Sequence, residues 1–247
     1  MKSLPVSEGP VALLGDAHLR ENDAEVAAFV RFLDSLPHDI RTLAILGDLF
    51  SVWIGSPGLQ RRHHRLVAEA LARLRERGCA LLYVEGNHDF FLTRLHGGRL
   101  FDQCAADSLD LVLGGRRVHL AHGDLVNIRD RQYRAWRAVS KNRLFFSAFS
   151  LLPARARLSI AERLDRRLAT TNMRHKSGFP LAECEAYARR RIAEGTEILI
   201  FGHFHEERRL DYRVHDRMGS VLVLPAWRDG HRYLRIEPGG EPVFVSA

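Results

Sequence analysis

The chain has 247 residues, of which 46% are hydrophobic and 27% are charged, and its formal net charge is +7. This composition is typical of a water-soluble globular protein with a substantial core, and it excludes disordered, collagen-like and membrane-bundle proteins. No run approaches the ~20 apolar residues of a membrane-spanning helix, and residues 1–10 do not resemble a signal peptide. The cysteines Cys79, Cys104 and Cys184 lack CxxC spacing, so we expect reduced cytoplasmic thiols.

The excess positive charge is concentrated in one part of the chain. Residues 128–176 contain 13 Lys and Arg against 3 Asp and Glu, which leaves this segment at +10 and the rest of the chain at −3. Such a local concentration favours an anionic surface or substrate over general nucleic-acid binding, so we expect no nucleic-acid partner.

Apolar runs and helical patterns alternate through the first half of the chain. Residues 11–14, 43–46 and 80–84 are strand-like, whereas apolar residues within 26–36 and 66–74 repeat at a helical spacing near 3.6. This order predicts parallel strands covered by helices, which is an α/β fold. Further strands are expected at 118–121, 198–201, 221–224, 233–236 and 243–245.

Five of the apolar runs are followed at once by polar residues that can bind metal. These residues are Asp16, His18, Asp48, Asn87, His88, His122, His203 and His205. The carboxyl ends of parallel strands meet at one edge of a sheet, so we expect these side chains to converge. Oxygen and imidazole ligands without sulfur suit Mn²⁺, Fe or Zn²⁺. The D-x-H and H-x-H spacings would direct both members of each pair the same way in an extended segment, and Asp48 could bridge two metals.

The order of these residues resembles the calcineurin-like metallophosphoesterase superfamily. Its blocks D-x-H, G-D, G-N-H-[DE], H and G-H-x-H match residues 16–18, 47–48, 86–89, 122 and 202–205. The resemblance implies a four-layer αββα sandwich that binds two divalent metal ions, with Mn²⁺ expected. The implied ligands are Asp16, His18, Asp48 and His205 for one metal and Asp48, Asn87, His122 and His203 for the other. It also implies that His88 binds phosphate or protonates the leaving oxygen, while Asp89 orients the His88 imidazole.

One branch of this superfamily, the UDP-2,3-diacylglucosamine hydrolases of lipid A biosynthesis, is similar at further positions. Its G-D-L-F-x-x-W-x-G block matches residues 47–55, and its aliphatic-Ala-Trp pattern resembles residues 224–227. The resemblance implies hydrolysis of UDP-2,3-diacylglucosamine to 2,3-diacylglucosamine 1-phosphate and UMP. The residues it would place at the substrate are Trp53, Asp130, Tyr133 and Arg137. Asn172, Arg174 and Lys176 would meet the nucleotide or sugar phosphate, or would belong to an ordinary basic loop.

The segment 128–177 is expected to be a helical insertion or cap within a single domain of residues 1–247. Its apolar stretch 144–152 is flanked by basic residues on both sides. This pattern suits a cap that grips acyl chains and meets an anionic inner-membrane surface, with the protein peripheral on the cytoplasmic face. Alternatively, the apolar face packs on the core and the cations are solvated. The sequence gives no indication of the oligomeric state.

Two positions depart from the hydrolase branch. The best-known members carry Arg where this chain has His88, and an acidic pair where it has Ser56 and Pro57. The alternatives are therefore a phosphodiesterase or phosphatase acting on another nucleotide or soluble phosphoester, and a non-catalytic scaffold on the same fold.

Overall fold

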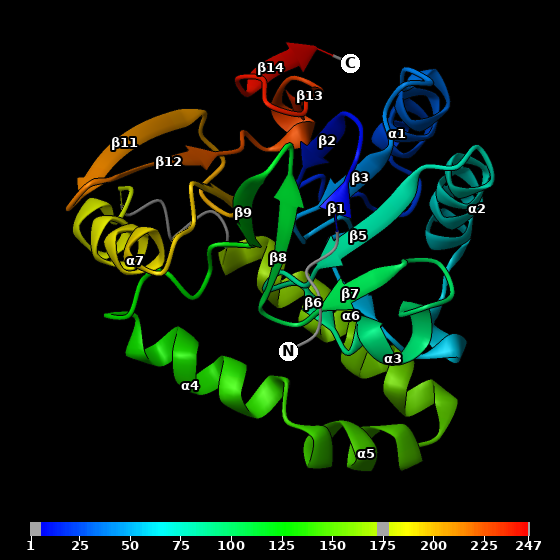
Figure 1. Cartoon of the computed structure of the whole chain (residues 1–247). Helices are drawn as coiled ribbons and strands as arrows, with labels where there is room; N and C mark the ends of the chain where they lie inside the picture. The colour runs from blue at the N-terminus through cyan, green and yellow to red at the C-terminus, as the bar shows by residue number, and fades with distance from the viewer. Residues whose placement is uncertain (1–5, 172–177, 247) are drawn as a thin grey trace.

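The computed structural model describes residues 6–171 and 178–246, in which two six-stranded sheets pack face to face (Figure 1). One sheet has the order β1-β8-β9-β10-β12-β11. Its strands are β1 (Val6–Ser7), β8 (Ser108–Leu113), β9 (Arg116–Ala121), β10 (Ile198–Phe201), β12 (Arg217–Val223) and β11 (Arg208–Val214). The other sheet has the order β14-β13-β2-β3-β5-β7. Its strands are β14 (Val243–Ser246), β13 (Arg232–Ile236), β2 (Val11–Leu14), β3 (Thr42–Ile45), β5 (Ala80–Val84) and β7 (Gln103–Ala105).

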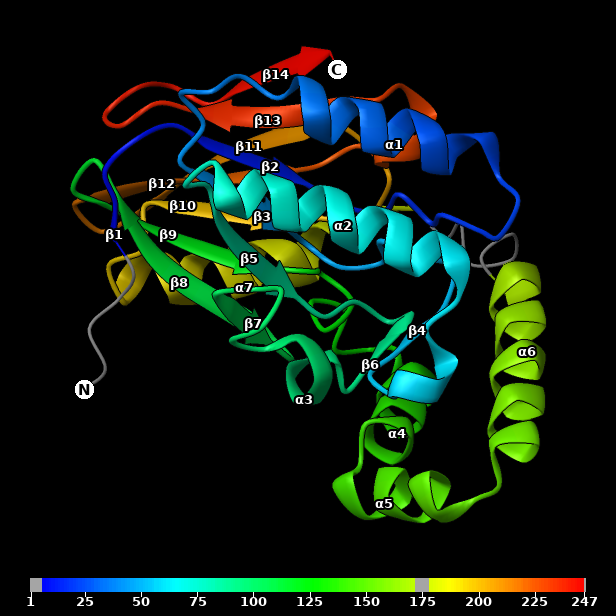
Figure 2. The ribbon, with the colours of Figure 1, turned by 90° about the vertical axis from the view of Figure 1, so that its right-hand side faces the viewer.

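Helices cover the outer face of each sheet, as Figures 1 and 2 show. Helices α1 (Ala24–Ser35) and α2 (Arg62–Glu76) pack on the sheet that contains β2, β3 and β5. Helix α7 (Leu181–Ala193) packs on the opposite sheet, beside β11 and β12. The layers therefore follow the order helix, sheet, sheet, helix, and the predicted αββα sandwich is confirmed.

Burial on both faces explains why the central strands are apolar throughout. In β2, Ala12 and Leu14 join the core beneath α1 and α2, while Val11 and Leu13 join the core between the sheets. Alternate residues of a strand point to opposite faces, so a strand covered on both sides needs an unbroken apolar run.

The parallel strands bring the ends that carry polar residues to one edge. β2, β3 and β5 are parallel neighbours in one sheet, and β9, β10 and β12 are parallel neighbours in the other. A small parallel pair, β4 (Trp53–Ile54) and β6 (Asp89–Phe90), lies beyond this edge. Short helices complete the core: α3 (Leu92–His96), η1 (Pro57–Leu59) and η2 (Trp227–Asp229).

Three helices lie within the segment predicted to be a helical cap. They are α4 (Arg131–Ser140), α5 (Arg143–Leu151) and α6 (Ala154–Thr171), and they stand outside the sandwich layers (Figure 2). The full extent of the insertion stays a prediction, because residues 172–177 lie outside the described part of the chain. Among the described residues, no helix is long and apolar enough to span a bilayer.

The apolar stretch of α5 is divided between the core and the solvent. Phe146 and Phe149 are buried in a cluster with Ile54, Leu59 and Phe90. By contrast, Leu144 and Leu151 are 81% and 87% exposed. Packing on the core, one of the two alternatives for this stretch, therefore accounts for only one face of the helix.

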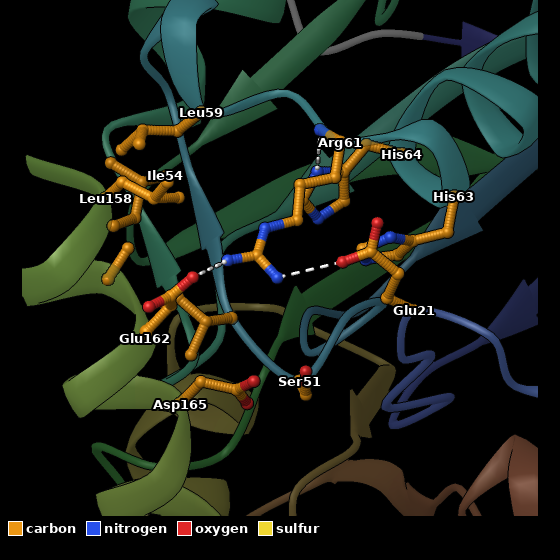
Figure 3. Close-up of a pocket in the computed structure, with 12 residues that line it drawn as sticks. Glu21, Ser51, Ile54, Leu59, Arg61, His63, His64, Leu158, Glu162 and Asp165 are labelled. Carbon is orange, nitrogen blue, oxygen red and sulfur yellow. Dashed lines mark hydrogen bonds and ion pairs between the residues drawn. The ribbon is translucent and has the colours of Figure 1, made fainter. Parts of the chain in front are cut away.

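Helix α6 faces the core across a pocket, which Figure 3 shows in close-up. The Arg61 guanidinium occupies this pocket and donates to Glu21 Oε2 at 2.9 Å and to Glu162 Oε1 at 3.0 Å. Arg157 of α6 also donates to Ser56 Oγ at 3.0 Å. These side chains connect α6 to the loops that precede α2.

Candidate metal centre

The residues that follow the parallel strands converge at one point. Asp16 Oδ1 lies 3.2 Å from His205 Nε2, and His18 Nε2 lies 3.3 Å from His205 Nε2. These three residues come from the ends of β2 and β10, which belong to different sheets. The sandwich therefore brings together ligands that lie nearly 190 residues apart in the chain.

Asp48 lies at the middle of the cluster. Its Oδ2 is 3.6 Å from His122 Nε2, 3.8 Å from His88 Nε2 and 3.9 Å from His18 Nε2. On the far side, Asn87 Oδ1 lies 3.0 Å from both His122 Nε2 and His203 Nδ1. Three overlapping groups in the described chain have ligand atoms within 4.8 Å of one another: Asp16 with His18 and His205, His18 with Asp48 and His88, and Asp16 with Asp48 and His122.

The backbone at these residues is unusual. Asp16, His18, Asp48, His203 and His205 all have positive φ, between 44° and 68°. A non-glycine residue in this region costs about 1–3 kcal/mol, and such residues collect at functional sites where the surrounding structure imposes the conformation. The prediction that the D-x-H and H-x-H pairs converge through extended backbone is therefore wrong. Their side chains converge because each residue of the pair turns through the left-handed region.

Two glycines allow the backbone to approach the carboxylates closely. A Cβ on Gly86 would lie 2.1 Å from Asp48 Oδ1, and a Cβ on Gly202 would lie 2.6 Å from Asp16 Oδ2. Neither distance leaves room for a side chain, so these two positions require glycine.

The electrostatics of the cluster suit bound cations. Asp16 and Asp48 are fully buried, yet no Lys or Arg of residues 6–171 and 178–246 forms an ion pair with either. Burial by itself raises the pKa of Asp16, but His205, His122 and His18 outweigh it and hold the carboxyl pKa well below its ordinary value. Two buried negative charges without a fixed positive partner are costly, and divalent metal ions would supply the missing charge.

Two imidazoles of the cluster, those of His18 and His203, are in the form that binds metal. Burial lowers the pKa of His18 and of His203 to about 4, so both rings are neutral at pH 7, the form that a metal requires. The pKa of His122 is raised to about 9, because Asp48 and Asp16 outweigh the effect of its burial. His122 Nδ1 donates to Leu46 O at 2.7 Å, which directs Nε2 toward Asp48 and Asn87. The residues therefore fit the two divalent ions that the motifs imply.

Comparison with known proteins agrees with this geometry. The model of the family described as "Calcineurin-like phosphoesterase" matches residues 9–207. The chain belongs to this family. Among curated proteins, it is 33% identical to the UDP-2,3-diacylglucosamine hydrolase of Ralstonia nicotianae, over 95% of this chain and 93% of that protein. It is 31% identical to the hydrolase of the same name from Aeromonas salmonicida, over 92% of this chain and 89% of that protein. The family and these relatives identify a hydrolase with a metallophosphoesterase domain.

In this phosphoesterase, His88 is held beside Asp48 by a backbone carbonyl. Its Nδ1 lies 2.5 Å from Ser51 O, and because a carbonyl only accepts, Nδ1 carries the proton of this hydrogen bond. Nε2 is buried without a hydrogen-bond partner in the described chain and lies 3.8 Å from Asp48 Oδ2. The orphaned nitrogen is thus directed into the cluster, where it can meet an incoming ligand.

The prediction that Asp89 orients the His88 imidazole is wrong. Asp89 Oδ2 instead accepts hydrogen bonds from Asp48 N at 3.0 Å, Gly86 N at 2.7 Å and Tyr83 Oη at 2.9 Å. Among the described residues, the hydrogen bonds of the Asp89 carboxylate go to these groups and none goes to the ring of His88. Burial and the charge of Asp48 raise the pKa of Asp89 to about 7. Asp89 therefore fixes the backbone around Asp48.

Trp53 is a core residue in this structure, and the prediction that it contacts substrate is not supported. Its side chain is 1% exposed, and its Nε1 donates to Gln60 Oε1 at 2.9 Å. Its ring packs against Phe50 and Tyr83. The backbone N–H of Trp53 donates to His88 O at 2.9 Å, and this hydrogen bond helps to hold the backbone of His88 in place.

The predicted substrate residues of α4 bind the protein itself. Asp130 caps the helix by accepting from Tyr133 N at 2.8 Å. The hydroxyl of Tyr133 donates to Asp124, and Arg137 Nε lies 3.3 Å from the same carboxylate. Arg137 also donates to Asp107 Oδ1 at 2.7 Å. Tyr133 and Arg137 thus fasten α4 to the loop after His122, and the contact of these three residues with substrate stays a prediction.

The remaining predicted contacts, Asn172, Arg174 and Lys176, lie outside the described residues. Three residues of the site were not predicted from the sequence: Ser51, Tyr83 and Asp124. Ser51 acts through its carbonyl, and Tyr83 reads as an ordinary member of an apolar strand. Asp124 could have been predicted from the triplet His122-Gly123-Asp124, because a carboxylate two residues after a metal ligand lies close to the metal centre.

Proposed function

We propose that the chain hydrolyses the phosphoanhydride of UDP-2,3-diacylglucosamine, giving UMP and 2,3-diacylglucosamine 1-phosphate in lipid A biosynthesis. The observation that carries the proposal is the cluster around Asp48, set in a chain that matches UDP-2,3-diacylglucosamine hydrolases over nearly its whole length. The apolar and basic cap adds support, because a lipid substrate needs both apolar contacts and positive charge.

The ligand assignment is part of the proposal. Asp16, His18, Asp48 and His205 would hold one divalent ion, and Asp48, Asn87, His122 and His203 would hold the other. The set of oxygen and nitrogen donors supports Mn²⁺, with Fe and Zn²⁺ as alternatives to be tested. When bound, the two ions supply Lewis acidity for a water molecule and for the phosphoryl oxygens.

The protein's own groups have separate tasks. His88 presents Nε2 toward the centre while Ser51 O fixes the proton on Nδ1. A protonated His88 can therefore donate at Nε2 to a phosphoryl or leaving oxygen, and a neutral one can accept a proton there. Asp89 keeps Asp48 in its left-handed conformation through the hydrogen bond to Asp48 N.

We also propose a peripheral, cytoplasmic location on an anionic bilayer. Helix α5 exposes Leu144, Phe145 and Leu151, and the exposed Arg143 and Arg155 precede and follow these residues in the sequence. Apolar side chains in the interface combined with cations, each contributing about 1 kcal/mol near an anionic surface, support reversible membrane binding.

The decisive experiment compares substrates. Purified protein is incubated with Mn²⁺ and UDP-2,3-diacylglucosamine in detergent micelles, and UMP release is followed by mass spectrometry. Asp48→Asn is the inactive control, and Fe and Zn²⁺ replace Mn²⁺ in parallel. Cleavage of a soluble diester such as bis(p-nitrophenyl) phosphate, with the lipid substrate left intact, would sink the substrate assignment.

Membrane binding is tested separately by co-sedimentation with vesicles of phosphatidylethanolamine and phosphatidylglycerol. The double variant Leu144→Ser/Leu151→Ser should lose most binding while retaining its thermal stability, since both side chains are exposed. Wild-type protein that stays in the supernatant at low salt would contradict the proposed location.

A further inference from the structure

The end of α4 is tied directly to the loop that carries Asn87 and His88. Lys141 follows the last residue of α4, and its Nζ donates to Gly86 O at 2.9 Å and lies 3.3 Å from Glu85 Oε2. The side chain of Lys141 is 12% exposed and that of Glu85 is 2% exposed. A cation of the cap thus lies within the structure, against the backbone that precedes a predicted metal ligand.

The carboxylate of Glu85, which forms the ion pair with Lys141, is held in place by α3. Glu85 Oε1 accepts from Leu92 N at 2.7 Å, at the first residue of α3. Both oxygens of Glu85 are therefore engaged, one by α3 and one by Lys141. A buried carboxylate that is bound at both oxygens has little freedom to move. Glu85 therefore fixes the position of the Lys141 ammonium group.

Movement of Gly86 would be transmitted to Asp48. The Cα of Gly86 is pressed so closely on Asp48 that a Cβ there would meet Oδ1 at 2.1 Å. Gly86 N donates to Asp89 Oδ2, which also holds Asp48 N. The next residue, Asn87, places its Oδ1 beside His122 and His203. The Gly86 peptide therefore lies between the cap and both sides of the cluster.

We propose that Lys141 is a positioning residue for the metal centre: by holding the Gly86 carbonyl from the cap, it sets the placement of Asp48 and Asn87. Its contacts are with Gly86 O and Glu85 Oε2, so it would act through the backbone of Gly86. The inference rests on the proposed function only in that the cluster binds divalent metal. Loss of an outer partner of this kind lowers metal affinity or activity by about 10–100-fold in known metal sites.

The test uses the full chain, stripped of metal with a chelator and titrated with Mn²⁺ alone in a calorimeter. Lys141→Met removes the ammonium group while keeping the length of the side chain. Arg134→Met removes a solvent-exposed cation from the same helix and is the matched control. We expect Lys141→Met to bind Mn²⁺ about 10–100-fold more weakly, and Arg134→Met to stay within about twofold of wild type.

Two readouts separate positioning from simple stabilisation. At saturating Mn²⁺ and with a cleavable phosphodiester, Lys141→Met should lower kcat with little change in KM, whereas Lys141→Arg, which restores the charge, should recover most of both affinity and kcat. If Lys141→Met does not fold, Lys141→Met/Glu85→Gln removes the unpaired buried charge and still lacks the contact to Gly86 O, so its Mn²⁺ affinity should remain low.

Unchanged Mn²⁺ affinity and kcat in a folded Lys141 variant would overturn the inference and leave Lys141 as an ion pair of the cap. That outcome leaves the proposed function standing, because wild type would still bind Mn²⁺. Wild-type protein that binds no Mn²⁺, Fe or Zn²⁺ would instead contradict both the proposed function and the inference.

Discussion

The cap is attached to the sandwich at two ends, and the two attachments differ in kind. At α4, Arg137 meets Asp124 and Lys141 meets Glu85, and all four side chains are at most 12% exposed. At α6, Arg61 meets Glu162 with side chains that are 32% and 45% exposed. The first attachment is buried and reaches the loops of the metal centre, whereas the second is partly exposed and lines the pocket between α6 and the core (Figure 3).

The difference shows which part of the cap is fixed. Breaking one partner of a buried ion pair leaves an uncompensated charge and costs about 3–5 kcal/mol, whereas an exposed pair contributes about 0–1 kcal/mol. α4 is therefore a rigid extension of the metal loops. The exposed ion pair of α6 contributes little, and the apolar residues that α6 packs on the core, Ala161 and Leu164, are only partly buried.

The largest effect is expected from Arg137→Met. This change leaves the buried Asp124 without its guanidinium partner, so we expect the free energy of unfolding to fall by about 3–5 kcal/mol. Urea unfolding followed by circular dichroism measures it. Arg134→Met, which removes an exposed cation one turn away, should change the free energy by less than about 0.5 kcal/mol. Equal effects of the two variants would contradict the assignment of α4 as the fixed end.

Phe146→Ala tests the apolar contact of α5 with the core, which lies between the attachments at α4 and α6. Phe146 stacks on Phe91 with ring centroids 4.2 Å apart and is 6% exposed. Removing the ring should cost about 3 kcal/mol through lost burial and a residual cavity. Phe145→Ala on the exposed face of α5 serves as the control, with an expected loss below about 1 kcal/mol. A loss at position 145 as large as that at 146 would show that α5 packs differently.

A pH dependence should appear at the α4 end. Burial raises the pKa of Asp124, but His122 and Arg137 outweigh it, so the folded-state pKa lies below the ~3.9 of an unfolded Asp. The stabilisation by this carboxylate is then fully present above about pH 4 and is lost as pH falls through the lower folded value. The difference in unfolding free energy between wild type and Asp124→Asn should therefore shrink from pH 7 to pH 3. A difference that stays constant would exclude this linkage.

The smallest effect is expected from Arg61→Met at the α6 end. Because both of its partners are about half exposed, global stability should fall by less than about 1 kcal/mol. Local opening is the more sensitive measurement. Hydrogen exchange of α6 amides should accelerate in the variant while that of α4 amides stays unchanged. Acceleration in both helices would mean that the cap opens as one unit.

Much of the fold and the candidate centre could be predicted from the sequence, because the signals are local. The strands at 11–14, 80–84 and 198–201 appear where the apolar runs place them. Their polar ends converge, since parallel strands must end at the same edge. Residues such as Asp16, Asp48 and His205 could thus be named from spacing and residue type alone.

Only the tertiary structure decided which partner each remaining side chain takes. Trp53 lies in a motif, yet its ring is enclosed by Phe50 and Tyr83, and Asp89 follows His88, yet it holds the backbone of Asp48. The sequence also could not show that Lys141 would reach Gly86 O, 55 residues away. Periodicity and spacing record which face of a strand or helix a residue occupies. Buried charges and hydrogen bonds are satisfied by whichever groups the packed layers bring within reach, and that depends on the whole fold.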